Sequence, residues 1–117
     1  MMKVYEYKNC GTCKKALNFL DAKKIDYQKI AIRETPPSKG ELKKMLGYLN
    51  GDIKKLFNVS GLDYKSLNIK DKLPNLTQDQ VLELLSSNGN LVKRPFVLSD
   101  KVGVVGFKED HWQTLFS

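Results

Sequence analysis

Cysteine, histidine and long apolar runs are nearly missing from this chain. Among its 117 residues there are two cysteines, Cys10 and Cys13, and one histidine, His111. No stretch approaches the ~20 apolar residues that a membrane span requires, and the N-terminal residues are too polar for a secretory signal. We therefore expect a cytoplasmic protein with no membrane partner, a setting in which a permanent structural disulfide is unusual.

Arginine is also scarce, although the chain is basic. Lysine and arginine number 20 against 13 acidic residues, which gives a net charge of +7, but only Arg33 and Arg94 are arginines. The lysines are spread along the chain in pairs, mostly on the polar faces of predicted helices, whereas recognition of base edges commonly uses arginine. The pattern favours a solvated lysine surface, and direct nucleic-acid binding is not expected.

The first third of the chain predicts a βαβ unit. Residues 3–7 and 27–32 each predict a short strand. Between them, a helix running to about Lys24 is predicted by apolar residues at helical spacing, namely Cys13, Ala16, Leu17 and Leu20. Lysines in its last turn would suit the negative end of the helix dipole. A strand, a helix and a strand within ~30 residues imply parallel strands joined by a right-handed crossover.

An all-helical segment is predicted in the middle of the chain. It follows Pro36-Pro37, which break the strand pattern, and occupies about residues 38–90. Ser38-x-x-Glu41 and Thr77-x-x-Gln80 have the sequence of capping boxes, which predict two helix starts inside the segment.

The last quarter of the chain predicts a hairpin and a closing helix. Strands are predicted at residues 95–98 and 102–107, joined by a tight connection. Trp112, Leu115 and Phe116 then give a short helix one apolar face. The whole order predicts the α/β class: one domain over residues 1–117, with a thioredoxin-like βαβ…ββα core and an all-helical insertion.

The two cysteines lie between the first strand and the first helix, as Cys10-Gly11-Thr12-Cys13. Backbone N–H groups and the positive dipole end at a helix N-terminus stabilise an anion, and the thiolate is the attacking form of cysteine. A zinc site that includes His111 and a pair of thiols without a role remain alternatives. A redox pair is favoured, because this spacing beside a βαβ pattern is typical of thioredoxin-like chemistry. Cys10 should be the more exposed sulfur, and Cys13 should resolve the mixed disulfide.

Arg94-Pro95 is the second candidate feature. A proline that opens a strand can hold a cis bond and present backbone groups to a ligand. A guanidinium beside it could bind a thiolate, an oxyanion or a carboxylate. A plain junction between loop and strand, with a surface arginine, is the alternative.

Several motifs together resemble the arsenate reductase/Spx (ArsC-like) family over essentially the whole chain. They are Tyr7-Lys8-Asn9-Cys10-Gly11-Thr12-Cys13-Lys14-Lys15-Ala16, Pro36-Pro37-Ser38-x-x-Glu41-Leu42, Val92-Lys93-Arg94-Pro95 and Val105-Gly106-Phe107. The resemblance implies a thioredoxin-like sheet with a helical insert. It also implies that Cys10 is the catalytic cysteine and that Arg94 precedes a cis-proline. Two further arginines of the glutathione- and glutaredoxin-coupled arsenate reductases have no counterpart at residues 56–60 and 106–108, so inefficient arsenate reduction is expected.

From these features we expect a thiol–disulfide redox protein. Cys10, Cys13 and Arg94 are the expected catalytic residues, and Gly11, Thr12 and Pro95 are expected to bind substrate. No metal or organic cofactor is implied. The expected partners are a thiol or disulfide substrate and a reductant, either glutathione or another cellular thiol or a glutaredoxin- or thioredoxin-type protein. We expect a monomer.

A regulator is the alternative that the resemblance leaves open. Spx-type proteins carry a two-cysteine loop, form a disulfide under oxidation and bind RNA polymerase. On that hypothesis, Cys10 and Cys13 sense oxidants, and the protein is a binding partner of RNA polymerase instead of an enzyme.

Overall fold

The computed structural model describes residues 2–116. Its helices and strands follow the order that the sequence predicts. They are β1 (Met2–Glu6), α1 (Gly11–Ala22), β2 (Tyr27–Ala31), α2 (Lys39–Tyr48), α3 (Leu62–Ser66), α4 (Ile69–Lys72), α5 (Gln78–Ser87), β3 (Phe96–Leu98), β4 (Gly103–Val105) and α6 (Glu109–Leu115), with short 3-10 turns at Ile53–Leu56 (η1), Leu73–Asn75 (η2) and Gly89–Leu91 (η3).

The four strands form one mixed sheet in the order β2-β1-β3-β4. β1 and β2 are parallel, with Val4 opposite Lys29, and α1 is the crossover between them. β3 lies between β1 and β4 and is antiparallel to both. This is the βαβ…ββα topology of a thioredoxin-like core, and the prediction of fold class is confirmed.

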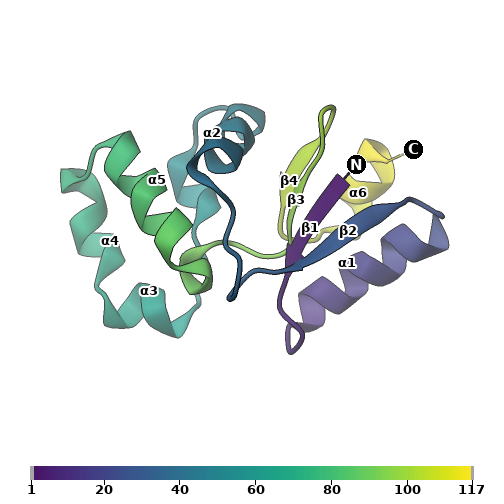
Figure 1. Cartoon of the computed structure of the whole chain (residues 1–117), viewed down its shortest axis with the longest axis horizontal. Coiled ribbons are helices and arrows are strands. Elements are labelled where there is room, and N and C mark those ends of the chain that lie inside the picture. Colours follow the sequence, from purple (N-terminus) through teal and green to yellow (C-terminus); the bar gives the residue numbers. More distant parts are fainter. Residues whose placement is uncertain (1, 117) are drawn as a thin grey trace.

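Helices cover both faces of the sheet (Figure 1). Successive strand residues point to opposite faces, so Val4 and Val97 pack with Trp112 against α1 and α6. Their neighbours Tyr5 and Phe96 pack into a second core with α2 and α5. The helical segment between β2 and β3 is therefore packed against one face of the sheet. That residues 1–117 form one domain stays a prediction.

Both predicted capping boxes are present. The Ser38 side chain accepts a hydrogen bond from the Glu41 N–H, and the Glu41 carboxylate accepts one from the Ser38 N–H. Thr77 and Gln80 make the same reciprocal pair at the start of α5. These contacts satisfy N–H groups that the first helical turn leaves without partners.

Several predicted boundaries differ from the observed ones by one or two residues. Two of them are the end of α1 and the end of β4. α1 ends at Ala22, so Lys23 and Lys24 lie after the helix and not in its last turn. Lys24 adopts the left-handed conformation with φ 57°. β4 ends at Val105 instead of residue 107, because Gly106 has φ 73°, a conformation outside the β region.

Gly89 joins the end of α5 to the loop after β2. A Cβ atom at this position would overlap the carbonyl oxygen of Ile32 and lie 3.2 Å from Cα of Arg33. Since both contacts are with backbone, Gly89→Ala is expected to lower the free energy of unfolding by about 2–3 kcal/mol, as overpacking in a tight core does. Denaturant unfolding measures this change.

Gly47→Ala is the matched control for that variant. Gly47 is exposed inside α2, and a Cβ there would meet nothing within 4 Å. Because alanine is the better helix former, this variant is expected to gain about 0.5–1 kcal/mol. Equal stability of the two variants would contradict the packing of η3 against residues 32 and 33.

Candidate functional site

Cys10 occupies the N-cap of α1. Its backbone is extended, and its Sγ accepts a hydrogen bond from the backbone N–H of Cys13 at 3.2 Å. The Cys10 N–H in turn donates to the carbonyl of Tyr7 at 3.0 Å, which closes the loop after β1. As a residue, Cys10 is half-buried. It therefore lies where N–H groups and the helix dipole favour a negative charge.

Cys13 lies one turn further into α1 and is fully buried. Burial, followed by the adjacent Cys10 sulfur, raises the pKa of its thiol to about 12. A thiol with that pKa is almost wholly protonated at neutral pH. The two sulfurs thus differ in the way the sequence predicts, with Cys10 the more accessible and Cys13 at the start of the buried stripe.

Arg94 and Pro95 are joined by a cis peptide bond just before β3. Pro95 is buried, and its carbonyl accepts a hydrogen bond from the Gly106 N–H at 2.9 Å. The Arg94 guanidinium lies over the ring of Tyr7, with Cζ 4.9 Å from the ring centroid. Since Tyr7 also binds the Cys10 N–H, one residue links the arginine to the cysteine loop.

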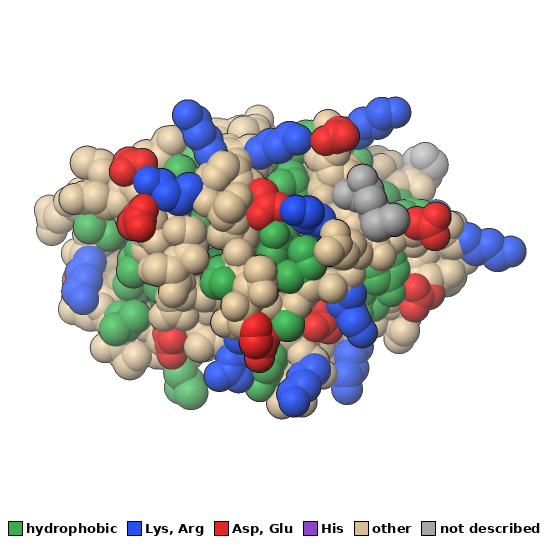
Figure 2. All heavy atoms as spheres, in the orientation of Figure 1, with side chains coloured by type: hydrophobic (Ala, Val, Ile, Leu, Met, Phe, Trp, Pro, Cys, Tyr) green, Lys and Arg blue, Asp and Glu red, His purple; other side chains and the backbone are tan. Residues whose placement is uncertain are grey.

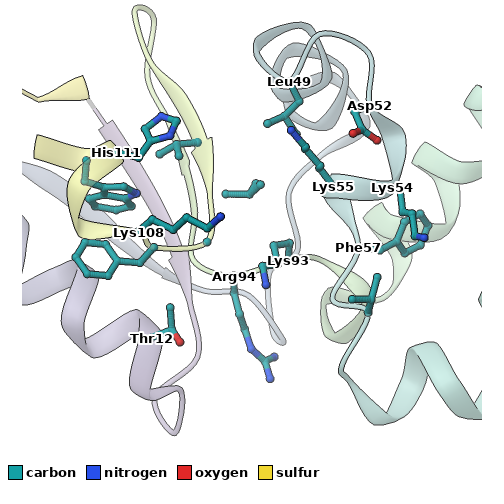
Figure 3. Close-up of a pocket in the computed structure, with 16 residues that line it drawn as sticks. Thr12, Leu49, Asp52, Lys54, Lys55, Phe57, Lys93, Arg94, Lys108 and His111 are labelled. Carbon is teal, nitrogen blue, oxygen red and sulfur yellow. The ribbon is translucent and has the colours of Figure 1, made fainter. Parts of the chain in front are cut away.

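A groove of about 630 Å³ runs between the sheet and the helical segment (Figure 3). Thr12 contributes to it from the cysteine loop, and Arg94 from the start of β3. Its basic side chains are Lys54, Lys55, Lys93, Arg94, Lys108 and His111. Among the described residues that line it, Asp52 alone is acidic. A space of this size with these charges suits an anionic small molecule or peptide segment.

Backbone pairing brings the two sides of the groove together. The residues after η1 form an isolated antiparallel bridge, Phe57 with Val92. Two hydrogen bonds of 2.8 Å flank it, from the Asn58 N–H to the Leu91 carbonyl and from the Lys93 N–H to the Leu56 carbonyl. This pairing fixes the lysines of η1 beside the segment that leads to Arg94.

The lysines of the groove were not predicted from the sequence. Residues 56–60 and 106–108 lack arginine, but Lys54 and Lys55 lie just before the first of these positions, and Lys108 lies within the second. Elsewhere the expected solvated surface is found: Figure 2 shows basic side chains interspersed with acidic ones on the face it presents. The local sequence carries no signal that separates groove lysines from surface lysines.

His111 and Gly11 are both exposed. His111 is exposed on α6 and lines the groove. Within residues 2–116, no three histidine, cysteine or acidic side chains gather where they could hold a metal ion. Gly11 is exposed at the first position of α1, beside Cys10. The same part of the chain has no helix that is long and apolar enough to cross a bilayer.

Fold and site together define a thioredoxin-like protein with a two-cysteine loop at a helix N-terminus. The family model of the ArsC family matches residues 5–115. The chain therefore belongs to the ArsC family, as its motifs indicate.

Curated and solved relatives cover nearly the whole chain. The uncharacterized protein YusI of Bacillus subtilis is 45% identical over 109 residues, which are 93% of this chain and 92% of YusI. A possible arsenate reductase from Streptococcus mutans superposes with a TM-score of 0.87 at 35% identity, covering 97% of this chain and 98% of that one. The global transcriptional regulator Spx of Listeria innocua is 28% identical over 110 residues, 94% of this chain and 82% of Spx.

Proposed function

We propose that the protein is a thiol–disulfide oxidoreductase in which Cys10 attacks and Cys13 resolves. The observation that carries the proposal is the unequal placement of the two sulfurs. Cys10 caps α1 at the protein surface, whereas Cys13 is buried one turn behind it and donates its N–H to the Cys10 sulfur. In that arrangement the Cys10 sulfur can reach a substrate, whereas the Cys13 sulfur can react only after a mixed disulfide has formed on Cys10.

In the first step, the Cys10 thiolate attacks one sulfur of a substrate disulfide. A bond forms between Cys10 Sγ and that sulfur, the substrate S–S bond breaks, and the other half leaves as a thiolate. The helix N-terminus and the Cys13 N–H stabilise the anionic nucleophile before attack. Arg94, held over Tyr7, would orient an anionic group of the substrate.

In the second step, Cys13 loses its proton and attacks Cys10 Sγ. The mixed disulfide breaks, the second substrate half leaves as a thiolate, and a Cys10–Cys13 disulfide remains. Once Cys10 is in a mixed disulfide its negative charge is gone, which removes one cause of the raised pKa of Cys13. The resolving thiol is therefore easier to ionise at the stage when it is needed.

The two cysteines supply the two electrons that reduce the substrate, so an external reductant must restore them. Two thiols, from glutathione or another cellular thiol or from a glutaredoxin- or thioredoxin-type protein, would reduce the Cys10–Cys13 disulfide by the same exchange. The residues described require no metal or organic cofactor for these steps. A cytoplasmic location, where such thiols are abundant, belongs to the same proposal.

The groove favours substrates with negative charge. Five lysine and arginine side chains line it, so anionic disulfides should be attracted and oriented there. Arsenate is a weaker candidate, because the groove offers lysines where a cage of arginines would bind an oxyanion bidentately. Gly11, Thr12 and Pro95 would contact the reacting part of the substrate with their backbone and small side chains.

Turnover of a small model disulfide tests the proposal. The reduced protein, with excess glutathione, glutathione reductase and NADPH, should reduce bis(2-hydroxyethyl) disulfide well above the rate without protein. Arsenate in the same assay should give little turnover. Absence of disulfide turnover with both glutathione and a thioredoxin system would contradict the proposed activity.

A redox-sensing regulator that binds RNA polymerase is the second candidate. The observation in its favour is the similarity to Spx over 94% of the chain. Capture of RNA polymerase by the immobilised protein, compared under oxidising and reducing conditions, tests this candidate. Redox-dependent capture without turnover of disulfides would favour the regulator, and turnover without capture would favour the reductase.

A further inference from the structure

The two arginines of the chain meet at one aromatic ring. Arg33, in the loop after β2, and Arg94, before β3, each place Cζ 4.9 Å from the ring centroid of Tyr7. Arg33 Nη1 also donates a hydrogen bond of 2.9 Å to the Tyr7 hydroxyl, and Asn9 Nδ2 donates one of 3.1 Å. Cation–π contacts and hydrogen bonds thus hold two guanidinium groups against a single platform.

Within the described part of the chain, no carboxylate forms an ion pair with either guanidinium. Within residues 2–116, the ion pairs of the structure all use lysine as the cation, and none includes Arg33 or Arg94. Two like charges on one ring repel each other, and a bound anion would relieve that repulsion. A guanidinium offers paired N–H donors that match the two oxygens of a carboxylate.

Arg94 lines the groove, and both arginines line a second, smaller cavity. Its volume is about 220 Å³, and the rest of its lining is Asn58, Gly61, Leu62, Asp63 and Asn90. Asp63 Oδ2 already accepts hydrogen bonds from Asn88 and Asn90, at 3.1 and 3.4 Å. With two guanidinium groups and one carboxylate, the lining has a net positive charge. Whole-ligand pockets are commonly larger, ~300–1,000 Å³, so this cavity fits one end of a substrate.

Tyr7 connects the arginines of this cavity with the loop that carries Cys10. Tyr7 supports both arginines with its ring and accepts the Cys10 N–H with its carbonyl. An anionic group bound between the arginines would therefore be held beside the cysteine loop.

We infer that Arg33, Arg94 and Tyr7 form a binding subsite for a free carboxylate of a small disulfide substrate. The inference rests on the proposed thiol–disulfide exchange and adds the substrate class, a disulfide with a carboxylate a few bonds from its sulfur. Arg33 binds the carboxylate and determines specificity without taking part in the exchange. Tyr7 is a positioning residue, since it acts through the two arginines.

Three disulfides of similar size test the subsite. They are bis(2-hydroxyethyl) disulfide, which is neutral, 3,3′-dithiodipropionate, with two carboxylates, and cystamine, with two ammonium groups. The dicarboxylate is expected to have a kcat/KM roughly tenfold or more above that of the neutral compound, as one charge-assisted hydrogen-bonded pair allows. Cystamine should be the slowest of the three.

Arg33→Gln should remove most of that preference, because the kcat/KM for the dicarboxylate should fall much more than the kcat/KM for the neutral disulfide. Lys15→Gln is the matched control, because it removes one positive charge from an exposed position on α1 outside both cavities. It should keep the preference. Tyr7→Phe, which keeps the ring, should retain more of the preference than Tyr7→Leu. Equal loss in Arg33→Gln and Lys15→Gln, or no preference in the unmodified protein, would overturn the subsite.

Binding without chemistry separates the subsite from the proposed activity. In a Cys10→Ser background, 3,3′-dithiodipropionate should shift the NMR signals of the Arg33 and Arg94 side chains, and a further Arg33→Gln change should weaken the binding at least fivefold. If this binding is seen but no disulfide is turned over, the proposed function fails and the subsite stands. If turnover is seen without carboxylate-dependent binding or preference, the subsite is wrong and the proposed function stands.

Discussion

The Cys10→Ser variant is expected to lose disulfide reductase activity by roughly a thousandfold or more, as removal of a covalent nucleophile does. A serine hydroxyl is not ionised at neutral pH and forms no disulfide. The variant therefore lacks a nucleophile for the first exchange step. The assay is the glutathione-coupled reduction of bis(2-hydroxyethyl) disulfide described above.

Stability is the control for this variant. Serine is a favourable N-cap residue, and its hydroxyl can accept the Cys13 N–H that the sulfur accepts now. The thermal midpoint of Cys10→Ser should therefore equal or exceed that of the unmodified protein. A well-folded variant that keeps a tenth of the activity would contradict the role of Cys10 as nucleophile.

The Cys13→Ala variant is expected to stop at the mixed disulfide. Without the resolving sulfur, only an external thiol can release the mixed disulfide on Cys10. Turnover with limiting glutathione should therefore fall by roughly a hundredfold. Mass spectrometry of the intact variant should show the mass of one substrate half added. Alanine is preferred to serine here because position 13 is fully buried, where an unpaired hydroxyl would be costly.

The comparison with the unmodified protein decides this prediction. The unmodified protein should accumulate no adduct and should instead lose two hydrogen masses as its two cysteines join. Full turnover by Cys13→Ala at limiting glutathione would show that Cys10 works alone. That result would contradict the resolving role and leave the first step intact.

Local sequence patterns predicted most of the fold. Capping boxes, helical spacing and strand alternation depend on neighbours within a few residues, so they identified the helical segment and the sheet that it joins. The cysteine loop was predictable for the same reason, since Cys10 and Cys13 lie at a strand-to-helix junction. Errors fell at element ends such as Lys24 and Gly106, where the backbone adopts positive φ.

The rest of the site could not be predicted, because it is made by contacts between distant segments. Arg33 follows β2 and shows no motif, yet it reaches the ring of Tyr7 that Arg94 also covers. The lysines of η1 enter the groove only through the pairing of Phe57 with Val92. A sequence pattern within one helix or strand carries no information about either of these contacts between distant segments.

The central claim is that Cys10 is the reactive nucleophile and Cys13 the protected resolving thiol. Alkylation of the reduced protein with limiting iodoacetamide at several pH values tests this claim most directly. Both cysteines fall in the tryptic peptide of residues 9–14, so tandem mass spectrometry assigns the label. At pH 7 the label should be on Cys10. Labelling of Cys13 should be at least roughly a hundredfold slower and still rising at pH 10, since its thiol has a pKa of about 12 and only the thiolate reacts. Equal labelling of both cysteines at pH 7, or Cys13 labelled first, would contradict the account.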